Sequence, residues 1–337
     1  MATKPTLSIA LDPALTPDLI SAEHLSRLAL NCALLSAEPL TGFWSPDEQW
    51  RLSQSDILLT GWGAPRLDQA ALAAAPRLRL IAHAGSSVKS FIAPEAWEDG
   101  ITVVSAAAAN AVPVAEFALA AILLANKGVF AAQARLARER AFWLPQWMAP
   151  GEPGNFGATV GIVGASRTGR KLLELLAPFD IEALVFDPFL GEEDARGLGA
   201  AKVSLAELLE RSRTVCIQAP ALPETFHMIG REELHLMRDG TTLINTARGT
   251  LVDHAALVSE LVLGRLYAVL DVTDPEPLPA QSPLYGLPNV FLTPHVAGAA
   301  GYETRRMTDL VIDEIERFVA GKPLRHSVSR EMLASIG

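Results

Sequence analysis

Short apolar runs of strand-like composition alternate with segments of helical spacing along almost the whole chain, and this alternation limits the possible folds more than any other feature. Continuous apolar runs separated by helices are typical of parallel sheets that are covered on both faces. The alternation therefore predicts an α/β protein with doubly wound parallel sheets, and the 337 residues are enough for two domains. The predicted strands cover residues 7–11, 57–60, 80–84, 102–104, 159–163, 182–187, 214–218, 241–245, 267–271 and 290–292.

Two longer segments have the spacing of helices. Residues 113–140 predict one long helix with Pro113 in its first turn, where proline is favoured. A loop rich in Pro, Gly and Trp follows over residues 142–156, and a new series of strands and helices begins at residue 159. Residues 303–320 predict a last helix with one apolar face, which has to pack on one of the two domains. That face consists of Met307, Leu310, Val311, Ile315, Phe318 and Val319.

Charge and cysteine content exclude several classes of partner. The 28 Lys and Arg residues against 38 Asp and Glu residues give a formal charge of −10, and no basic block is present. Such a chain repels phosphate backbones and anionic lipid surfaces, so no nucleic acid is expected as a partner. The two cysteines, Cys32 and Cys216, lie far apart in apolar stretches. They predict buried free thiols and a reducing compartment, and their spacing predicts no metal site.

The sequence indicates neither a secretion signal nor a membrane partner. The first 15 residues have no apolar stretch behind a basic start. The most apolar window, residues 117–125, is shorter than the ~20 residues that span a bilayer. These features predict a cytoplasmic protein.

A strand, a tight turn and the start of a helix follow one another in the middle of the chain. Gly164, Ser166 and Gly169 occupy the positions of the motif G-x-G-x-x-G, with a serine in place of the middle glycine. In this motif the first glycine permits the turn, the last lets helix and strand approach, and N–H groups of the helix start bind a pyrophosphate. The segment predicts a dinucleotide site, against the alternative of a turn that binds nothing. Asp187 favours the site because an acid about 20 residues beyond the turn binds the adenosine ribose; its alternative role is to cap the following turn.

Three polar residues follow the ends of three predicted strands in the same series: Arg248, Glu276 and His295. Because ligands bind at the carboxyl ends of parallel strands, we expect these side chains to converge. Reduction of a 2-keto acid needs a proton donor at the carbonyl oxygen, which a histidine supplies near neutral pH. A carboxylate stabilises the imidazolium, and an arginine grips the substrate carboxylate and polarises the carbonyl. The alternatives are that Arg248 caps its strand and that Glu276 is a solvated loop acid.

Six segments together form a highly specific pattern. They are residues 110–116, 161–170, 219–225, 245–249, 270–277 and 293–298. On these segments the chain resembles the D-isomer-specific 2-hydroxyacid dehydrogenase family over nearly its full length. The resemblance implies two Rossmann-like domains: a discontinuous substrate domain of residues 1–108 and 299–337, and an NAD-binding domain of residues 109–298. It also implies a homodimer formed through the NAD-binding domains.

The resemblance also implies roles for individual residues. His295 is the expected acid/base, Glu276 its partner and Arg248 the substrate clamp. The family's substrate-carboxylate loop, whose backbone N–H groups are donors, corresponds to Gly85, Ser86, Ser87 and Val88. Asp271 ends its strand where it is expected to accept a hydrogen bond from the nicotinamide carboxamide. The residues expected at NAD are Asn110, Gly164, Ser166, Arg167, Thr168, Gly169, Asp187, Ala219, Pro220, Thr225, Thr246, Ala247 and Asp271.

The expected function is hydride transfer between NAD(H) and C2 of a small 2-hydroxy or 2-keto acid. Glyoxylate, hydroxypyruvate, pyruvate and bulkier keto acids all fit a site defined by a carboxylate and a carbonyl. The alternative is an NAD(H)-sensing binding protein of corepressor type without significant turnover. Formate dehydrogenases resemble the family too, but they have glutamine where Glu276 stands.

The chain departs from the family pattern at three positions. Ser166 replaces a glycine, Gln218 stands where many members have histidine, and Lys89 stands where an aspartate is common. Trp143 and Trp147 lie just beyond the predicted long helix. Either they reach the active site of the neighbouring subunit, as aromatic residues of this region do in similar dimers, or they pack in the core.

Overall fold

The computed structural model describes residues 4–89, 91–140 and 154–334. The chain divides into two compact units, and each unit has its own sheet. The first unit combines Met1–Asn110 with Ala299–Gly337, and the second is Ala111–Gly298.

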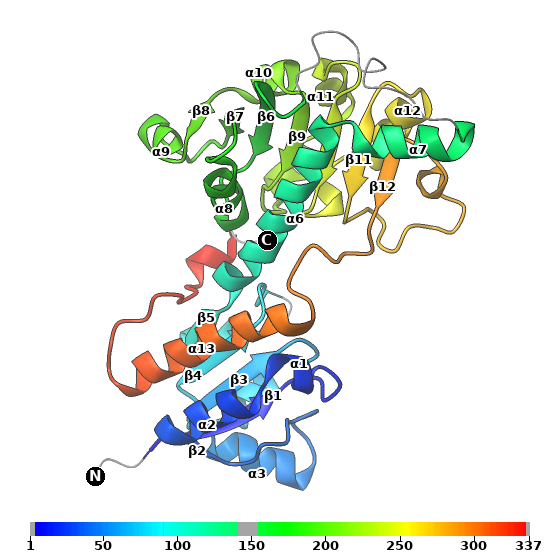
Figure 1. Ribbon diagram of the computed structural model, residues 1–337. Helices are drawn as coiled ribbons and strands as arrows, with labels where there is room; N and C mark the ends of the chain where they lie inside the picture. Colours follow the sequence, from blue (N-terminus) through cyan, green and yellow to red (C-terminus); the bar gives the residue numbers. More distant parts are fainter. Residues whose placement is uncertain (1–3, 90, 141–153, 335–337) are drawn as a thin grey trace. The chain divides into compact units, whose positions relative to one another are not determined.

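The first unit contains a sheet of five parallel strands in the order β2-β1-β3-β4-β5 (Figure 1). The strands are β1 (Thr6–Ala10), β2 (Ala33–Leu34), β3 (Ile57–Gly61), β4 (Leu80–Ala84) and β5 (Thr102–Ser105). The helices are α1 (Thr16–Leu19), α2 (Ala22–Asn31), α3 (Pro46–Gln54), α4 (Gln69–Ala73), α5 (Glu95–Glu98) and α13 (Thr304–Val319), with 3₁₀ turns at Gly301–Glu303 and Glu331–Ala334. Every residue of β3 and β4 is buried, as expected for central strands covered on both faces.

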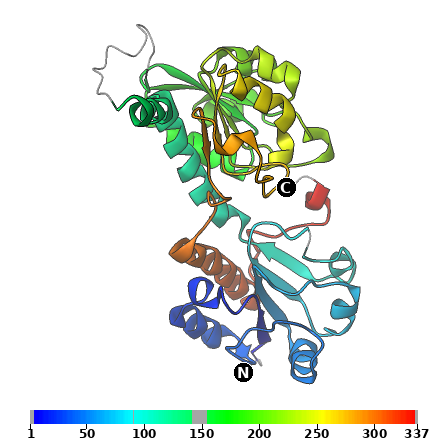
Figure 2. The ribbon, with the colours of Figure 1, turned by 90° about the vertical axis from the view of Figure 1, so that its right-hand side faces the viewer.

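Helix α13 comes from the far end of the chain and packs on the first sheet (Figure 2). Its buried residues Met307, Val311 and Ile315 share one core cluster with β1 and with helices α1 and α2. Helices α3, α4 and α5 pack in a second cluster that also contains strand residues of this sheet. The face predicted for the last helix therefore packs in the first unit at Met307, Val311 and Ile315, with Leu310 and Phe318 partly buried beside them, whereas Val319 is exposed.

The second unit contains seven parallel strands in the order β12-β11-β10-β9-β6-β7-β8. The strands are β6 (Ala158–Val163), β7 (Ile181–Phe186), β8 (Ala200–Lys202), β9 (Thr214–Ile217), β10 (Thr242–Asn245), β11 (Tyr267–Leu270) and β12 (Val290–Leu292). The helices are α6 (Ala107–Asn126, which begins in the first unit), α7 (Val129–Glu139), α8 (Arg167–Leu176), α9 (Glu192–Gly197), α10 (Leu205–Arg211), α11 (Arg231–Leu236) and α12 (His254–Val262). Short 3₁₀ turns lie at Pro223–Thr225, Gly249–Leu251 and Pro283–Tyr285.

The order of the seven strands reverses at β6. From β6 the chain continues outward through β7 to β8, then returns to β9 on the other side of β6 and continues outward to β12. Helices α6, α8 and α9 contribute to one core cluster, and α10, α11 and α12 contribute to another. In such a doubly wound sheet, ligands bind beyond the carboxyl ends of the strands where the order reverses.

The predicted fold class is confirmed, and each of the ten predicted strands is present with ends shifted by no more than one residue. The prediction missed β2 and β8, which are two and three residues long. Strands this short have no detectable alternation, and both lie at the edge of a sheet.

The predicted single helix over residues 113–140 is wrong. Two helices, α6 and α7, replace it, and Gly128 separates them with a left-handed φ of 66°. Helix α6 begins at Ala107, so Pro113 lies inside the helix rather than in its first turn. The alanine-rich start was not recognised as helical because proline is rare in helix interiors, where it removes a hydrogen bond.

Among the described residues, α6 is the one helix long and apolar enough to cross a membrane by length and composition. The helix has 20 residues and is longer than residues 117–125, the most apolar window found in the sequence. Ala115, Ala118 and Ile122 nevertheless pack in the core of the second unit. Because the core helices of soluble proteins meet the same criteria, the length of α6 carries little weight for a membrane.

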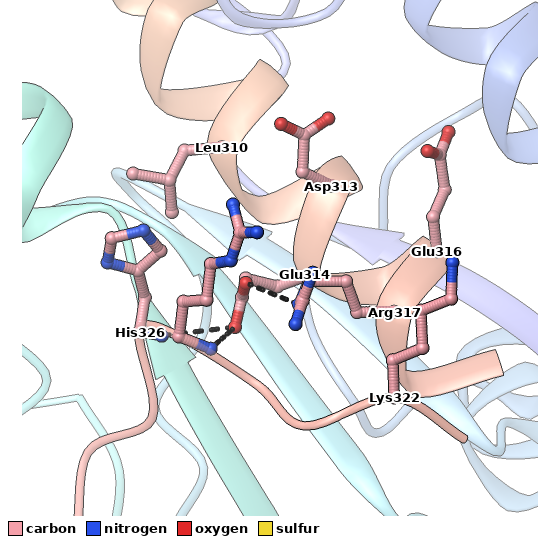
Figure 3. A pocket seen from close by; sticks show the side chains of 8 residues that line it. Leu310, Asp313, Glu314, Glu316, Arg317, Lys322 and His326 are labelled. Carbon is pink, nitrogen blue, oxygen red and sulfur yellow. Dashed lines mark hydrogen bonds and ion pairs between the residues drawn. The ribbon is translucent and has the colours of Figure 1, made fainter. Parts of the chain in front are cut away.

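A buried carboxylate fastens the segment after α13 to that helix. The side chain of Glu314 is only 1% exposed and accepts backbone N–H bonds from Arg325 at 2.8 Å and from His326 at 3.1 Å (Figure 3). The Nε of Arg317 lies 3.8 Å from the same carboxylate and donates at 2.7 Å to the carbonyl oxygen of Pro323. These bonds connect both ends of the segment to one turn of the helix.

We expect Glu314→Ala to lower the free energy of unfolding by about 3 kcal/mol, because two backbone N–H groups lose a charged acceptor. Glu316→Ala is the matched control, since Glu316 lies on the same helix and pairs at the surface with Arg27. A surface pair of this kind is worth about 0–1 kcal/mol. Urea denaturation measures both variants, and equal losses would contradict the role of Glu314.

Candidate active site

The turn between β6 and α8 has the geometry of a dinucleotide site. Gly164 has a left-handed φ of 101°, and a Cβ at this position would lie 2.5 Å from the backbone nitrogen of Ala219. A Cβ on Gly169 would lie 2.1 Å from the carbonyl oxygen of Gly164. Both positions therefore need glycine, one for the turn and one for the close approach of the helix.

Ser166 is the N-cap of α8. Its hydroxyl accepts the N–H of Gly169 at 3.3 Å, a role that the sequence interpretation did not include. The cap satisfies one of the four free N–H groups of the first turn, and those of Arg167 and Thr168 still point out of the helix start. Because an anion is stabilised at this end of a helix, the turn fits a pyrophosphate with serine in the middle position.

Asp187 closes the turn from the neighbouring strand. One carboxylate oxygen accepts the N–H of Ala165 at 2.7 Å, and the other accepts the N–H of Phe189 at 2.8 Å. The capping role is thus present. An ionised carboxylate has about four acceptor positions, so capacity remains for two ribose hydroxyl groups.

Several other residues expected at NAD have partners within the protein. The hydroxyl of Thr225 donates to the carbonyl oxygen of Pro220 at 2.7 Å and accepts the N–H of Leu222 at 2.8 Å. Gln218, buried where many relatives have histidine, donates to the hydroxyl of Thr246 at 2.9 Å. These bonds hold the loops that follow β9 and β10, and Ala219 and Ala247 belong to these loops.

Asn110, also expected at NAD, lies in the first unit. Its side-chain oxygen accepts the N–H of Ala299 at 2.9 Å. The bond joins the two places at which the chain passes from one unit to the other. Asn110 therefore holds together the chain segments that enter and leave the second unit.

The three predicted catalytic residues lie beyond the carboxyl ends of neighbouring strands β10, β11 and β12. Nδ1 of His295 lies 2.6 Å from Oε1 of Glu276, and the two side chains are 49% and 43% exposed. His295 has a left-handed φ of 57°, which is uncommon for a residue other than glycine. An imidazole that is held by a carboxylate and open to solvent on its other side is suited to proton transfer.

Asp271 holds the loop that carries His295. Its side chain is buried, and its carboxylate accepts the hydroxyl of Thr293 at 2.6 Å and the N–H groups of Val296 at 2.8 Å and Ala297 at 2.9 Å. The carbonyl oxygen of Asp271 also accepts the N–H of His295 at 2.9 Å. The structure thus shows a role within the loop, where the sequence suggested a contact to nicotinamide.

Arg248 is exposed at the end of β10. One Nη donates to the carbonyl oxygen of Ala247 at 2.7 Å, and Asn245 holds the backbone by donating to the carbonyl oxygen of Arg248 at 2.9 Å. The next residue, Gly249, presses against the loop that leads to Glu276, since a Cβ there would lie 2.0 Å from the carbonyl oxygen of Thr273. The other guanidinium donors have no protein partner in the described part of the chain, which leaves them for a ligand.

The loop of residues 85–88 lies in the first unit, directly after β4. Among the described residues, no acceptor is found for the backbone N–H groups of Ser86, Ser87 and Val88. The hydroxyl of Ser86 is buried, and it too has no partner there. Successive free N–H groups of this kind bind anions such as a carboxylate.

His83 is a residue of interest that the sequence interpretation missed. It lies 4% exposed in β4, and burial lowers its pKa to about 4, so the ring is neutral near pH 7. Its Nδ1 lies 2.9 Å from the hydroxyl of Thr60, and its ring stacks on Phe91. A Cβ on Gly85 would lie 2.4 Å from Nε2 of His83, so the loop begins with glycine. The sequence did contain a signal that could have identified His83, because it is a polar residue inside an otherwise apolar strand.

Two remaining expectations have different outcomes. Both cysteines are buried free thiols, as predicted, and burial raises the pKa of Cys32 to about 11 and that of Cys216 to about 12. Trp143 and Trp147 lie outside the described residues.

Comparisons with known proteins agree with this geometry. The family model for the NAD binding domain of D-isomer specific 2-hydroxyacid dehydrogenases matches residues 119–297. A glyoxylate reductase of Korarchaeum cryptofilum is 34% identical over 288 residues, which are 84% of this chain and 85% of that protein. A D-3-phosphoglycerate dehydrogenase of Mycobacterium tuberculosis is 36% identical over 273 residues, covering 80% of this chain and 50% of that protein, so the match spans half of its length.

A solved structure has the same fold over the full chain. The crystal structure of a phosphoglycerate oxidoreductase from Rhizobium etli has a TM-score of 0.82 and 26% sequence identity, and the match covers 98% of this chain and 100% of that one. The family model covers more than half of the 337 residues, and the glyoxylate reductase covers most of them. The chain therefore belongs to the D-isomer specific 2-hydroxyacid dehydrogenase family, and the matching family model describes its NAD binding domain.

Proposed function

We propose that the chain transfers a hydride reversibly between NAD(H) and C2 of a small 2-hydroxy or 2-keto acid, with His295, Glu276 and Arg248 as its catalytic residues. The 2.6 Å contact between His295 and Glu276 is the observation that carries the proposal. The pair lies at the carboxyl edge of the same sheet whose central turn fits a dinucleotide. A proton donor at that edge is what the reduction of a carbonyl requires.

Bound NADH supplies the hydride, and the protein side chains handle the proton and the substrate charge. Nδ1 of His295 donates to Glu276, which leaves the proton on Nε2 for the carbonyl oxygen of the substrate. Glu276 stabilises the imidazolium before transfer. The free guanidinium donors of Arg248 bind the carboxylate and polarise the carbonyl. The loop of residues 85–88, with free N–H groups at residues 86–88, is by itself the carboxylate-binding element proposed for the first unit.

Turnover separates the enzyme from an NAD(H)-sensing binding protein. NADH absorbance is followed with glyoxylate, hydroxypyruvate, pyruvate and bulkier 2-keto acids in turn. We expect at least one acid to be reduced. NADH binding without oxidation by any acid would support the sensing protein instead, although the similar proteins carry enzyme names.

The proposal includes a homodimer formed through the second unit. Leu124, Val129 and Leu136 are exposed apolar side chains on helices α6 and α7. Apolar side chains that gather on one surface favour association with another protein chain. We expect a mass in solution of twice 36.0 kDa, and a mass of one chain at assay concentration would contradict the dimer.

Asp187 predicts a preference for NADH over NADPH. A 2′-phosphate would bring two negative charges beside its carboxylate, and Glu192, Glu193 and Asp194 follow in the first turn of α9. We expect kcat/KM to favour NADH by at least about tenfold, which corresponds to ~1.4 kcal/mol. Initial rates with both cofactors and one active keto acid measure the preference. Equal or better rates with NADPH would mean that Asp187 does not contact the ribose.

A further inference from the structure

His254 is the first residue of helix α12, and both nitrogen atoms of its ring contact backbone groups. Nδ1 lies 3.2 Å from the carbonyl oxygen of Val252, and Nε2 lies 3.4 Å from the backbone nitrogen of Asp274. The first contact is local, whereas the second joins the start of α12 to the loop that follows β11. The ring therefore bridges two loops at the carboxyl edge of the second sheet.

The two contacts determine where the ring carries its proton. A carbonyl oxygen only accepts hydrogen bonds, so Nδ1 carries a proton and donates to Val252. A backbone N–H only donates, so Nε2 carries no proton and accepts from Asp274. A ring with a single proton is neutral. A second proton, on Nε2, would face the N–H of Asp274 and break the bond to the loop.

The surroundings of the ring keep it neutral at neutral pH. Burial is the largest cause and lowers the pKa of His254, and a charged His227 would lower this pKa further. Asp253, Asp274 and the carbonyl oxygen of Val252 act in the opposite direction. Because the net effect is a pKa below the ordinary value, the ring loses its bond to Asp274 only as the pH falls.

The loop that contains Asp274 also carries Glu276, two residues further along the chain. The residue before Asp274 packs tightly, since a Cβ on Gly249 would lie 2.0 Å from the carbonyl oxygen of Thr273. Beyond this anchored part of the loop, Oε1 of Glu276 lies 2.6 Å from Nδ1 of His295. The bond from the loop to Nε2 of the buried ring therefore helps to set the position from which Glu276 reaches His295.

We propose that neutral His254 is a positioning residue, which holds the loop of Glu276 so that its carboxylate meets His295. The inference rests on the proposed function, because His254 acts through the pair of His295 and Glu276. Protonation of the His254 ring removes the acceptor for the N–H of Asp274, and the loop loses this anchor. Reduction should therefore slow when His254 is protonated.

Two variants separate the acceptor atom from the rest of the ring. In His254→Gln the amide oxygen can occupy about the place of Nε2, and it accepts a hydrogen bond without titrating. His254→Leu has no acceptor. Near neutral pH we expect kcat for reduction to stay within about twofold in His254→Gln and to fall by about three- to tenfold in His254→Leu, the effect of one lost hydrogen bond. Equal values of kcat in the two variants would overturn the inference.

The pH profile of kcat gives a readout that a purely structural role would not change. His295 gains protons as the pH falls, so its own titration causes no loss of reduction at acidic pH. In the unmodified protein we expect kcat to decline at acidic pH toward the value of His254→Leu. Both variants should lack this decline, because neither has a group that titrates at this position. No acidic decline in the unmodified protein, or one that persists in both variants, would overturn the inference.

A double variant tests whether His254 acts through Glu276. In a chain with Glu276→Gln, the further change His254→Leu should alter kcat by less than about twofold, because the carboxylate that the loop positions is already gone. A loss as large as that of His254→Leu alone would contradict the positioning role.

The matched control is His235→Leu. His235 is an exposed histidine of the same unit, and its Nδ1 contacts a carbonyl oxygen of its own helix. This variant should keep kcat within about twofold of the unmodified protein and should retain the acidic decline, because surface substitutions have small effects. A loss of kcat equal to that of His254→Leu would overturn the inference.

NMR of the ring nitrogens, in the protein without cofactor, separates this inference from the proposed function. Near neutral pH we expect a protonated Nδ1 and an unprotonated Nε2, with the signals assigned by their loss in His254→Leu. A proton on Nε2 would overturn the inference whatever the protein reduces. If a 2-keto acid is reduced and His254→Gln and His254→Leu behave alike, the inference fails and the proposed function stands. If no 2-keto acid is reduced, the proposed function fails and the inference fails with it, even with Nε2 unprotonated.

Discussion

Replacement of His295 by alanine should lower kcat for reduction of a 2-keto acid by about 10²–10⁴-fold, the usual contribution of a positioned acid or base. The Kd of NADH should stay within a few-fold, because His295 lies beyond β12 and the phosphate turn lies between β6 and α8. Stopped-flow absorbance gives the rate, and fluorescence titration of NADH gives the Kd.

The control for this variant is His235→Ala. His235 lies in the same unit, is exposed, and contacts the carbonyl oxygen of Arg231 through Nδ1. Its loss should change kcat by less than about twofold, because surface substitutions have small effects. Similar losses of kcat in both variants would point to a general disturbance of the second unit and would remove His295 from the proposed mechanism.

Replacement of the carboxylate tests the contact of 2.6 Å between His295 and Glu276. Glu276→Gln removes the charged acceptor that orients the imidazole through Nδ1. We expect kcat for reduction to fall by about tenfold or more, the effect of a lost hydrogen bond to a charged group. An unchanged kcat would remove Glu276 from the mechanism and leave it a loop acid.

The sequence predicted the parts of the fold that repeat a strong pattern. Buried parallel strands such as β3 and β4 are apolar except at Thr60 and His83, so they differ clearly from the polar segments around them. The boundary at Gly128 gave a weaker signal, because apolar residues continue on both sides of it in α6 and α7. A single left-handed glycine ends one helix there, and periodicity alone does not reveal it.

The positions of the candidate site residues were predictable, but their hydrogen bonds were not. Strand ends placed Arg248, Glu276 and His295 at one edge of the sheet, because parallel strands share a direction. The loop-holding role of Asp271 depends on which side chains and N–H groups surround its carboxylate. Those neighbours are set by tertiary packing, which has no signature in spacing.

The same limit explains why His83 was missed. In the sequence it stands inside an otherwise apolar strand. Its contacts with the hydroxyl of Thr60 and the ring of Phe91 come from other segments of the first unit, which tertiary packing brings together. Such contacts leave no pattern in the spacing of residues.

Arg248→Lys should lower kcat/KM for the keto acid by about 10²-fold, although the charge is kept. The guanidinium is planar and offers a fork of donors, and one Nη is already used on the carbonyl oxygen of Ala247. That bond fixes the plane of the group and directs its free donors. A lysine ammonium has neither the fork nor this anchor, so it binds the carboxylate at one point and polarises the carbonyl poorly.

The matched control is Arg231→Lys, which changes another exposed arginine of the same unit at the start of helix α11. Steady-state kinetics with the keto acid and a separate titration of NADH measure both variants. For Arg248→Lys we expect the loss in kcat/KM together with a Kd for NADH within a few-fold, because the phosphate turn does not include this residue. Near-normal kinetics in Arg248→Lys would contradict the role of Arg248 in substrate binding. Arg248 would then have only a structural role at the end of β10, where Asn245 donates to its carbonyl oxygen.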